Sequence, residues 1–111
     1  MNQIKECRVT NGMDRDGNPA GGSVHGTGLT IKWQDGPLGH GEDRKEPNGT
    51  FVETVISSAK QRLEFYQRAS HGKFACRENE LAIKKLEEAL AFLEQRTSDR
   101  EAREVEGTHA V

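Results

Sequence analysis

Long apolar runs are what this sequence most clearly lacks. Of its 111 residues, 32% are apolar and 5% aromatic, with a single tryptophan and a single tyrosine. No stretch approaches the roughly 20 apolar residues that span a bilayer, and the first residues, MNQIKECRVT, do not resemble a secretory leader. We therefore expect a cytoplasmic protein without a membrane partner. So little apolar material predicts a thin fold, or one completed by partner chains.

The sequence also lacks a strong excess of either sign of charge, and it lacks the cysteines for a framework of disulfides. The 16 basic and 18 acidic residues leave a net charge of −2, which argues against binding a nucleic-acid polymer but permits a local cationic pocket. The two cysteines, Cys7 and Cys76, are too far apart for a CxxC motif, so we expect buried or idle thiols. The four histidines lack metal-ligand spacing, and no metal site is expected.

The composition changes near Asn48. Nine of the 12 glycines and all three prolines precede this residue, and helix formers dominate after it. We expect a single domain over 1–111, with a β-rich part and loop at 1–47 and a helical hairpin with a C-terminal tail at 48–111. The predicted fold class is α+β: a small N-terminal antiparallel β-sheet packed on a C-terminal antiparallel two-helix hairpin, completed by oligomerisation.

Strand signals are confined to the first part. Residues 29–34 alternate apolar and polar side chains, which places Leu29, Ile31 and Trp33 on one face of a strand. Residues 6–10 are a shorter candidate, and the segment 11–22 is rich in turn formers. Within it, DRDGN has glycine in the fourth position rather than the sixth, so we expect a tight turn and not a calcium loop.

Two helices are predicted in the second part. A capping box of Thr50 and Glu53 opens the first, which continues at helical spacing to about residue 67. Ser70-His71-Gly72 interrupts the pattern. The second helix begins near residue 75 or 76 and extends past residue 100, so the two should form an antiparallel hairpin.

Two groups of residues could bind an anion. In KFACREN, Phe74 and Arg77 lie at the start of the second helix, where a base could stack and backbone N–H groups could face an anion. Further along, Arg96, Arg100 and Arg103 extend the helix face beside Phe92.

Both groups also have an ordinary interpretation, which the residues by themselves favour. Phe74 could simply close the hairpin while Arg77 is solvated. The arginines could belong to a solvated helix end with local ion pairs such as Asp99 with Arg103.

Catalytic motifs are also missing. The sequence has no GxSxG, no Walker A lysine and no Cys/His or paired-carboxylate arrangement to which roles can be assigned. We therefore expect no catalytic residues and no cofactor.

The order of several segments does, however, resemble a known family. These segments are GTGLTIKWQDGPLG, NGTFVETVI, LEFYQ, KFACRENELAIKKLEEALAFLEQRT and DREAREVEGTHAV. They are similar to the Thoeris anti-defence family of phage nucleotide sponges, and the resemblance covers about residues 26–111. The helical hairpin looks like the one that this family shares with the anti-CBASS sponge proteins.

The resemblance implies a binding protein rather than an enzyme. Such sponges sequester glyco-cyclic ADP-ribose, the signal made by bacterial TIR-domain proteins, in the cytoplasm of the infected host. Some members also hold cyclic di- or trinucleotides at separate sites. Members form homo-oligomers, typically hexamers, with ligands held between protomers.

The resemblance also implies positions for ligand contacts and reverses the preference stated above for the arginines. Phe74 is expected to stack on adenine, with Arg77 and Asn79 beside it. The pocket wall is expected at Trp33, Gln34, Asp35, Gly36 and Pro37, continuing to Gly39. Contacts to phosphate or ribose from a neighbouring chain are expected from Arg100, Arg103, Gly107, Thr108 and His109.

Two other functions remain open at this point. The first is a hydrolase of the same signals, and the second is a module whose apolar hairpin face binds a host protein. It also remains open whether Trp33 faces the small core or a ligand.

Overall fold

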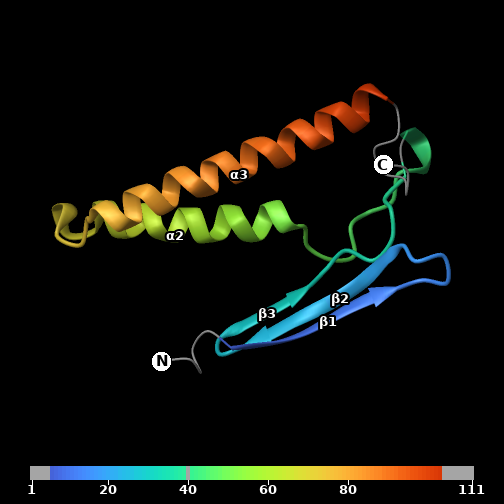
Figure 1. Ribbon diagram of the computed structural model, residues 1–111, viewed down its shortest axis with the longest axis horizontal. Coiled ribbons are helices and arrows are strands. Elements are labelled where there is room, and N and C mark those ends of the chain that lie inside the picture. Colours follow the sequence, from blue (N-terminus) through green and yellow to red (C-terminus); the bar gives the residue numbers. More distant parts are fainter. Residues whose placement is uncertain (1–5, 40, 104–111) are drawn as a thin grey trace. The chain divides into compact units, whose positions relative to one another are not determined.

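The computed structural model describes residues 6–39 and 41–103 (Figure 1). Its elements are, in order, β1 (Cys7–Met13), β2 (Pro19–Gly26), β3 (Leu29–Lys32), the 3-10 helix η1 (Gly41–Asp43), α2 (Val52–Gly72) and α3 (Arg77–Ala102). The predicted α+β class, a small antiparallel sheet followed by two helices, is confirmed. The described residues form two compact units, one ending at Phe51 and one spanning Val52–Arg103. Neither described helix is long and apolar enough to cross a membrane.

The sheet has the strand order β1-β2-β3, with both pairs antiparallel. Val9, Val24 and Ile31 are directly opposite one another across the three strands and so share one face. Ile31 is buried, whereas Val9 is 58% exposed. The predicted alternation is therefore confirmed within β3, although this strand ends at Lys32 and not at residue 34 as predicted. Its apolar face is only partly covered.

The first two strands differ from the prediction. β1 continues to Met13 instead of ending at Thr10, and the segment 11–22, predicted only to be rich in turns, contains the end of β1 and the start of β2. The start of β2 was not predicted because it is rich in glycine. β1 approaches β2 so closely that a Cβ at Gly22 would collide with the Thr10 carbonyl oxygen. The pairing of β1 with β2 therefore requires glycine at position 22, where residue propensity alone predicts a loop.

The tight turn predicted at DRDGN is confirmed between β1 and β2. The Asp14 carboxylate accepts hydrogen bonds from the backbone N–H groups of Asp16 (2.9 Å) and Asn18 (3.0 Å). The side chain thus closes its own turn, as aspartate commonly does.

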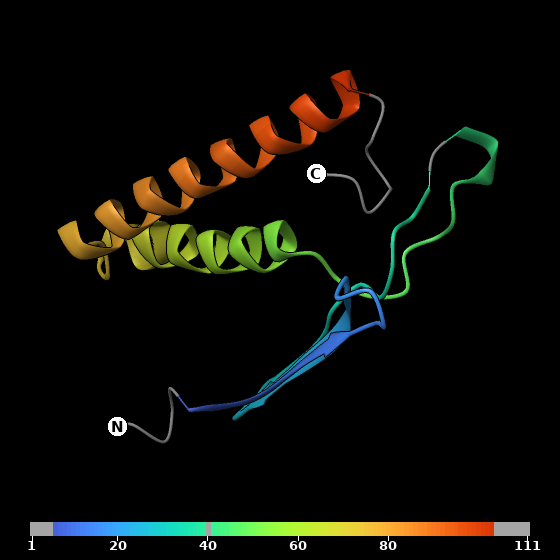
Figure 2. The ribbon, with the colours of Figure 1, turned by 45° about the vertical axis from the view of Figure 1, so that its right-hand side comes forward.

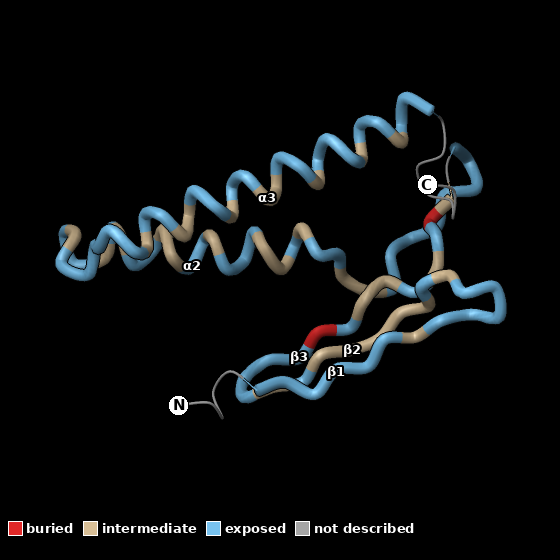
Figure 3. The backbone as a smooth tube through the Cα atoms, viewed as in Figure 1, coloured by how far each residue is buried: buried red, intermediate tan, exposed pale blue. Residues whose placement is uncertain are grey.

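The helices lie side by side and antiparallel, as Figures 1 and 2 both show. Lys60 of α2 reaches Glu87 of α3 across the seam, with 3.9 Å between Nζ and Oε1. The predicted stripe of α3 is half-buried, namely Ala82, Ile83, Leu86, Ala89, Leu90 and Leu93. No described residue of either helix is fully buried, and Figure 3 colours only Ile31 and Leu38 of the first unit as buried.

The connection between the helices confirms the predicted interruption. The backbone leaves helical geometry at Ala69, and Ser70, His71 and Gly72 then have left-handed φ angles of 50°, 57° and 86°. The Gln67 side chain bridges this turn: its Nε2 donates to the Cys76 carbonyl (3.0 Å) and its Oε1 accepts from the Cys76 N–H (2.9 Å). One amide therefore joins the end of α2 to the cap of α3.

The capping box predicted for the first helix is not formed. The backbone of Thr50 pairs with the end of the sheet instead, donating to the Lys32 carbonyl (2.8 Å) and accepting from the Gln34 N–H (3.0 Å). Thr50 also forms a parallel bridge with Trp33. This pairing holds Thr50 in the first unit, and α2 begins two residues later, at Val52.

The left-handed turn generates a stability prediction. His71→Gly should raise the unfolding free energy by about 0.5–1 kcal/mol, because only glycine adopts this conformation without steric cost. The matched control is Ser57→Gly in the regular part of α2, which should lower it by a similar amount. Thermal unfolding followed by circular dichroism measures both, and equal destabilisation by the two changes would contradict the assigned strain.

Candidate ligand-binding site

The predicted pocket wall is a loop organised around the side chain of Gln34. Its Oε1 accepts hydrogen bonds from the backbone N–H groups of Asn48 (2.9 Å) and Gly49 (3.3 Å). Its Nε2 donates to the carbonyls of Asp35 (3.3 Å) and Gly36 (3.2 Å). A primary amide has two donors and two acceptor lone pairs, so all four are in use. We therefore assign Gln34 to positioning the loop.

Asn48 supports the same loop from the opposite side. Its Oδ1 accepts from the Asp35 N–H (2.8 Å), and its Nδ2 donates to the Asp35 carbonyl (3.0 Å). The side chain of Asn48 thus pairs with both backbone groups of Asp35, as the backbone of a neighbouring strand would. Gln34 and Asn48 together join both ends of the segment Trp33–Phe51 at its base.

Further contacts restrict the rest of the loop. Gly49 passes so close to Trp33 that any side chain would collide with the Trp33 carbonyl oxygen. Leu38 is buried, and its carbonyl accepts from the Lys45 N–H (2.7 Å). Trp33 itself is half-buried and donates its backbone N–H to Gly22 (3.0 Å). The segment 33–39 is therefore built into the first unit rather than a slack linker.

The second predicted group lies at the turn end of the hairpin. The ring of Phe74 is 54% exposed, and the Lys73 ammonium lies 5.5 Å from its centroid. Arg77, exposed, is the first residue of α3, and Asn79 is half-buried. An exposed ring, two cations and the N-terminal N–H groups of a long helix thus occur together.

The third predicted group lies at the opposite end of α3. Arg100 is half-buried, and Arg103 terminates the helix, with its Nε 3.4 Å from the Asp99 carbonyl oxygen. Arg103 therefore meets the backbone of Asp99 and not the carboxylate that a local ion pair would require. Cations at this end also complement the helix dipole. Gly107, Thr108 and His109 lie outside the described residues.

Two of the three groups cannot meet within one hairpin. At about 1.5 Å per residue, Arg100 lies roughly 30 Å along α3 from Asn79. A single nucleotide ligand cannot touch both ends of one chain's helix. If both groups contact one ligand, they must come from different copies.

Several structural features escaped the sequence reasoning. The Arg62 guanidinium of α2 lies 4.9 Å from the ring centroids of both Phe65 and Tyr66, a cation–π cluster signalled by the spacing i, i+3 and i+4. Both cysteines are exposed and neither forms a disulfide, so of the two expectations for these thiols, buried or idle, the first is wrong and the second stays a prediction.

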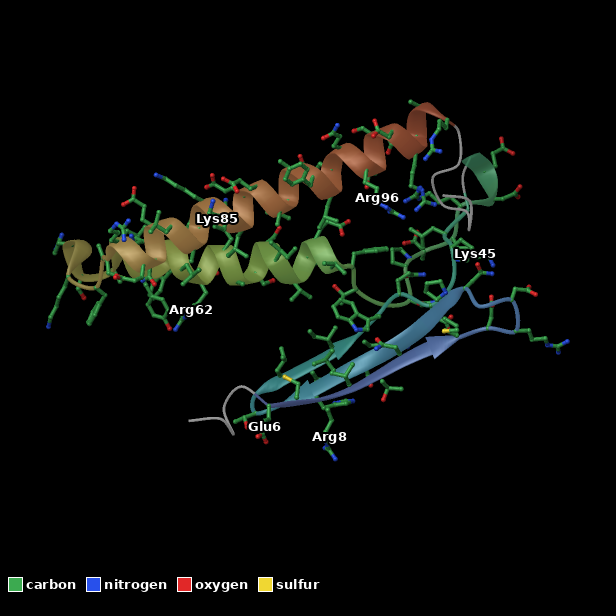
Figure 4. The ribbon with its side chains drawn as sticks, viewed as in Figure 1. Glu6, Arg8, Lys45, Arg62, Lys85 and Arg96 are labelled. Atoms are coloured by element: carbon green, nitrogen blue, oxygen red, sulfur yellow. The ribbon has the colours of Figure 1, made fainter. Side chains whose placement is uncertain are left out.

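An open hollow at one end of the sheet was also not predicted. Its lining consists of Glu6, Cys7, Arg8, His25, Gly26 and Thr27. Glu6 and Arg8 lie at the start of β1 in Figure 4. None of these residues was expected to contact a ligand.

Comparison with known proteins identifies relatives of both units. A family model described as "Acb2/Tad1, hairpin domain" matches residues 27–98, which is more than half of the chain. The chain is 46% identical over 81 residues to the protein named "Thoeris anti-defense 1" of Bacillus phage SBSphiJ7. That alignment covers 72% of this chain and 51% of the relative, so the chain spans about half the length of this relative.

The Gln34 contacts generate a prediction for the loop. Gln34→Ala should lower the unfolding free energy by about 1–3 kcal/mol, because it leaves the backbone N–H groups of Asn48 and Gly49 and the Gly36 carbonyl without their partner. Hydrogen exchange should accelerate at the N–H groups of Asn48 and Gly49. Gln61→Ala, an exposed site on α2, is the matched control and should change neither quantity. Unaltered protection of Asn48 and Gly49 in Gln34→Ala would refute this positioning role.

Proposed function

Because the chain belongs to the Acb2/Tad1 hairpin-domain family, we propose that it is a phage anti-defence sponge. In this proposal it binds and sequesters a cyclic nucleotide immune signal without cleaving it. The observation that carries the proposal is the 46% identity to a phage protein named Thoeris anti-defense 1. The ligand class proposed is glyco-cyclic ADP-ribose, with cyclic di- or trinucleotides as further ligands at separate sites.

The hydrogen bonds that hold the loop 33–39 support sequestration. A sponge competes with an effector for its signal and therefore benefits from slow release and a site that is ordered before binding. The loop 33–39 fits this requirement, because hydrogen bonds from the side chains of Gln34 and Asn48 hold it within the chain itself. Trp33, Asp35, Gly36 and Pro37 remain the predicted ligand contacts of this loop.

The turn end of the hairpin supports nucleotide binding. An adenine could stack on the exposed ring of Phe74, since stacking of a base on an aromatic side chain needs no sequence-specific contact. Arg77 and the first N–H groups of α3 would then face the pyrophosphate. Such recognition requires neither a metal nor a cofactor.

The length of α3 supports a site shared between copies. If Phe74 and Arg103 contact the same ligand, the roughly 40 Å length of the 26-residue α3 that separates them requires a homo-oligomer. We propose a hexamer in the cytoplasm of the infected host, with ligands held between protomers. The incomplete burial of both helices is consistent with this, because further copies would cover them.

A titration followed by chemical analysis tests the function. Calorimetry with glyco-cyclic ADP-ribose, and separately with a cyclic trinucleotide, should give saturable binding in a fixed ratio. After heat denaturation the signal should be recovered chemically intact. Recovery of a cleaved product would instead identify a hydrolase. Capture of a host polypeptide, without a thermal shift on adding either nucleotide, would identify a protein-interaction module.

The proposed stacking contact generates a prediction at Phe74. Phe74→Ala should weaken binding of glyco-cyclic ADP-ribose about tenfold or more, because base stacking contributes about 1–3 kcal/mol. The mass of the oligomer should not change. Phe65→Ala removes another exposed ring and should leave affinity unaltered. Equal affinities of the wild type and Phe74→Ala would show that the pocket lies elsewhere.

A further inference from the structure

The sheet has a second face, opposite the apolar face formed by Val9, Val24 and Ile31. Because side chains alternate along a strand, the residues that flank these three in each strand point to the other side. This polar sheet face consists of two cross-strand rows, the first Arg8, His25 and Thr30 and the second Thr10, Ser23 and Lys32. Five of the six residues are exposed, and Ser23 is half-buried. The face therefore presents cations and hydroxyl groups side by side.

The cations of this face are separated from the acidic residues of the chain. The chain contains more acidic than basic residues, yet none of the three strands contains an aspartate or a glutamate. Within residues 6–39 and 41–103, neither Arg8 nor Lys32 forms an ion pair, whereas Lys60, Lys84 and Lys85 of the helices each meet a glutamate. Two permanent cations without a counter-charge on one small face attract an external anion.

The spacing of the strands sets the size of the anion. Neighbouring strands lie about 4.8 Å apart, and residues two apart along a strand are separated by about 7 Å. The Cα atoms of Arg8 on β1 and Lys32 on β3 are therefore roughly 12 Å apart, and His25 on β2 lies between them. Side chains as long as these two can converge on a short chain of phosphate groups, to which the neighbouring hydroxyls can also donate.

The open hollow at the end of the sheet borders the polar sheet face. It shares Arg8 and His25 with that face, and its volume of about 590 Å³ is within the range of small-molecule sites. Among the described residues its lining contains one acid, Glu6, and no Phe, Tyr or Trp. Glu6 and Arg8 both project from the start of β1 in Figure 4. A nucleoside fits this space, but without an aromatic ring to stack on, most of the affinity has to come from phosphate.

We propose that the polar sheet face binds the phosphate chain of a nucleoside triphosphate, with the nucleoside in the adjoining hollow. The guanidinium of Arg8 offers parallel N–H donors to one phosphate, and the Lys32 ammonium acts as a point charge on another. Charge complementarity selects this ligand, because a linear triphosphate concentrates several negative charges on adjacent groups. Each phosphate of a cyclic oligonucleotide carries a single charge. The site is distinct from the proposed sponge site, since none of its residues is a predicted contact of the cyclic signal.

Calorimetry with ATP and with inorganic tripolyphosphate tests this site. Both should bind saturably, because recognition depends on the phosphate chain. Arg8→Ala and Lys32→Ala should each weaken both ligands about threefold to tenfold. Arg15→Ala removes an exposed cation from the turn of the same unit and is the matched control, which should change neither affinity. Failure of tripolyphosphate to bind, or equal weakening by Arg15→Ala, would overturn the proposal.

Removal of the neighbouring acid separates anion binding from a loss of structure. Glu6→Gln should strengthen the binding of tripolyphosphate about twofold to threefold, because it removes a negative charge from the hollow beside Arg8. A gain of affinity cannot result from unfolding. Glu42→Gln, at an exposed acid of η1 in the same unit, should leave the affinity unaltered. Unchanged or weaker binding by Glu6→Gln would contradict the assigned position of the anion.

A short aspartate peptide distinguishes phosphate recognition from general attraction to acidic molecules. Under the same conditions the peptide should bind at least about tenfold more weakly than tripolyphosphate, because its carboxylates are spread along a flexible backbone instead of adjacent to one another. Equal affinities for the peptide and for tripolyphosphate would identify a nonspecific cationic surface and would refute a triphosphate site.

Discussion

A single seam between α2 and α3 is the constraint on which the rest of the structure depends. Two helices offer each other only one face, so the hairpin leaves every one of its described residues at least partly exposed. The sheet adds little apolar cover within its own unit, where the only buried described residues are Ile31 and Leu38. A chain with 32% apolar residues thus folds locally while leaving helix surfaces that further copies would cover, and this supports the proposed assembly.

Side-chain amides compensate for the small core at two places. Gln67 joins the two ends of the hairpin turn through the backbone of Cys76, and Gln34 joins the two ends of a long loop through Asn48 and Gly49. Each amide satisfies backbone groups that a larger sheet or helix would otherwise pair. As a result, backbone groups have partners at the loop and at the turn, where ligand contacts are proposed, although few apolar groups are buried there.

The periodicity of apolar residues predicted most of the helices and strands. It failed where contacts between residues distant in the sequence determine the local structure. The helix pattern located α2 and α3, and alternation located β3, because both depend on spacing within one element. β2 was missed because Gly22 serves the approach of a neighbouring strand, which local composition cannot reveal. The prediction that Thr50 caps α2 was wrong for a similar reason, since the backbone of Thr50 pairs with Lys32 and Gln34 at the end of the sheet.

The candidate site was predicted by resemblance more than by physical reasoning on the sequence. Nothing local marks Gln34 as the centre of a loop, because two of its partners lie about 14 residues further along the chain. The separation of Phe74 from Arg103 could have been read from helix length alone. It changes the interpretation of the arginines, which either serve a second ligand or complete the site of another copy.

Complementation between two binding-deficient variants tests most directly whether the ligand site is shared between copies. Chains carrying Phe74→Ala and chains carrying Arg103→Ala would be co-expressed, purified as mixed oligomers and titrated calorimetrically with glyco-cyclic ADP-ribose. A shared site predicts that about a quarter of the sites regain wild-type affinity, because random pairing unites the two intact halves in that fraction. Mixed oligomers that bind no more ligand than the two variants purified separately would contradict a shared site.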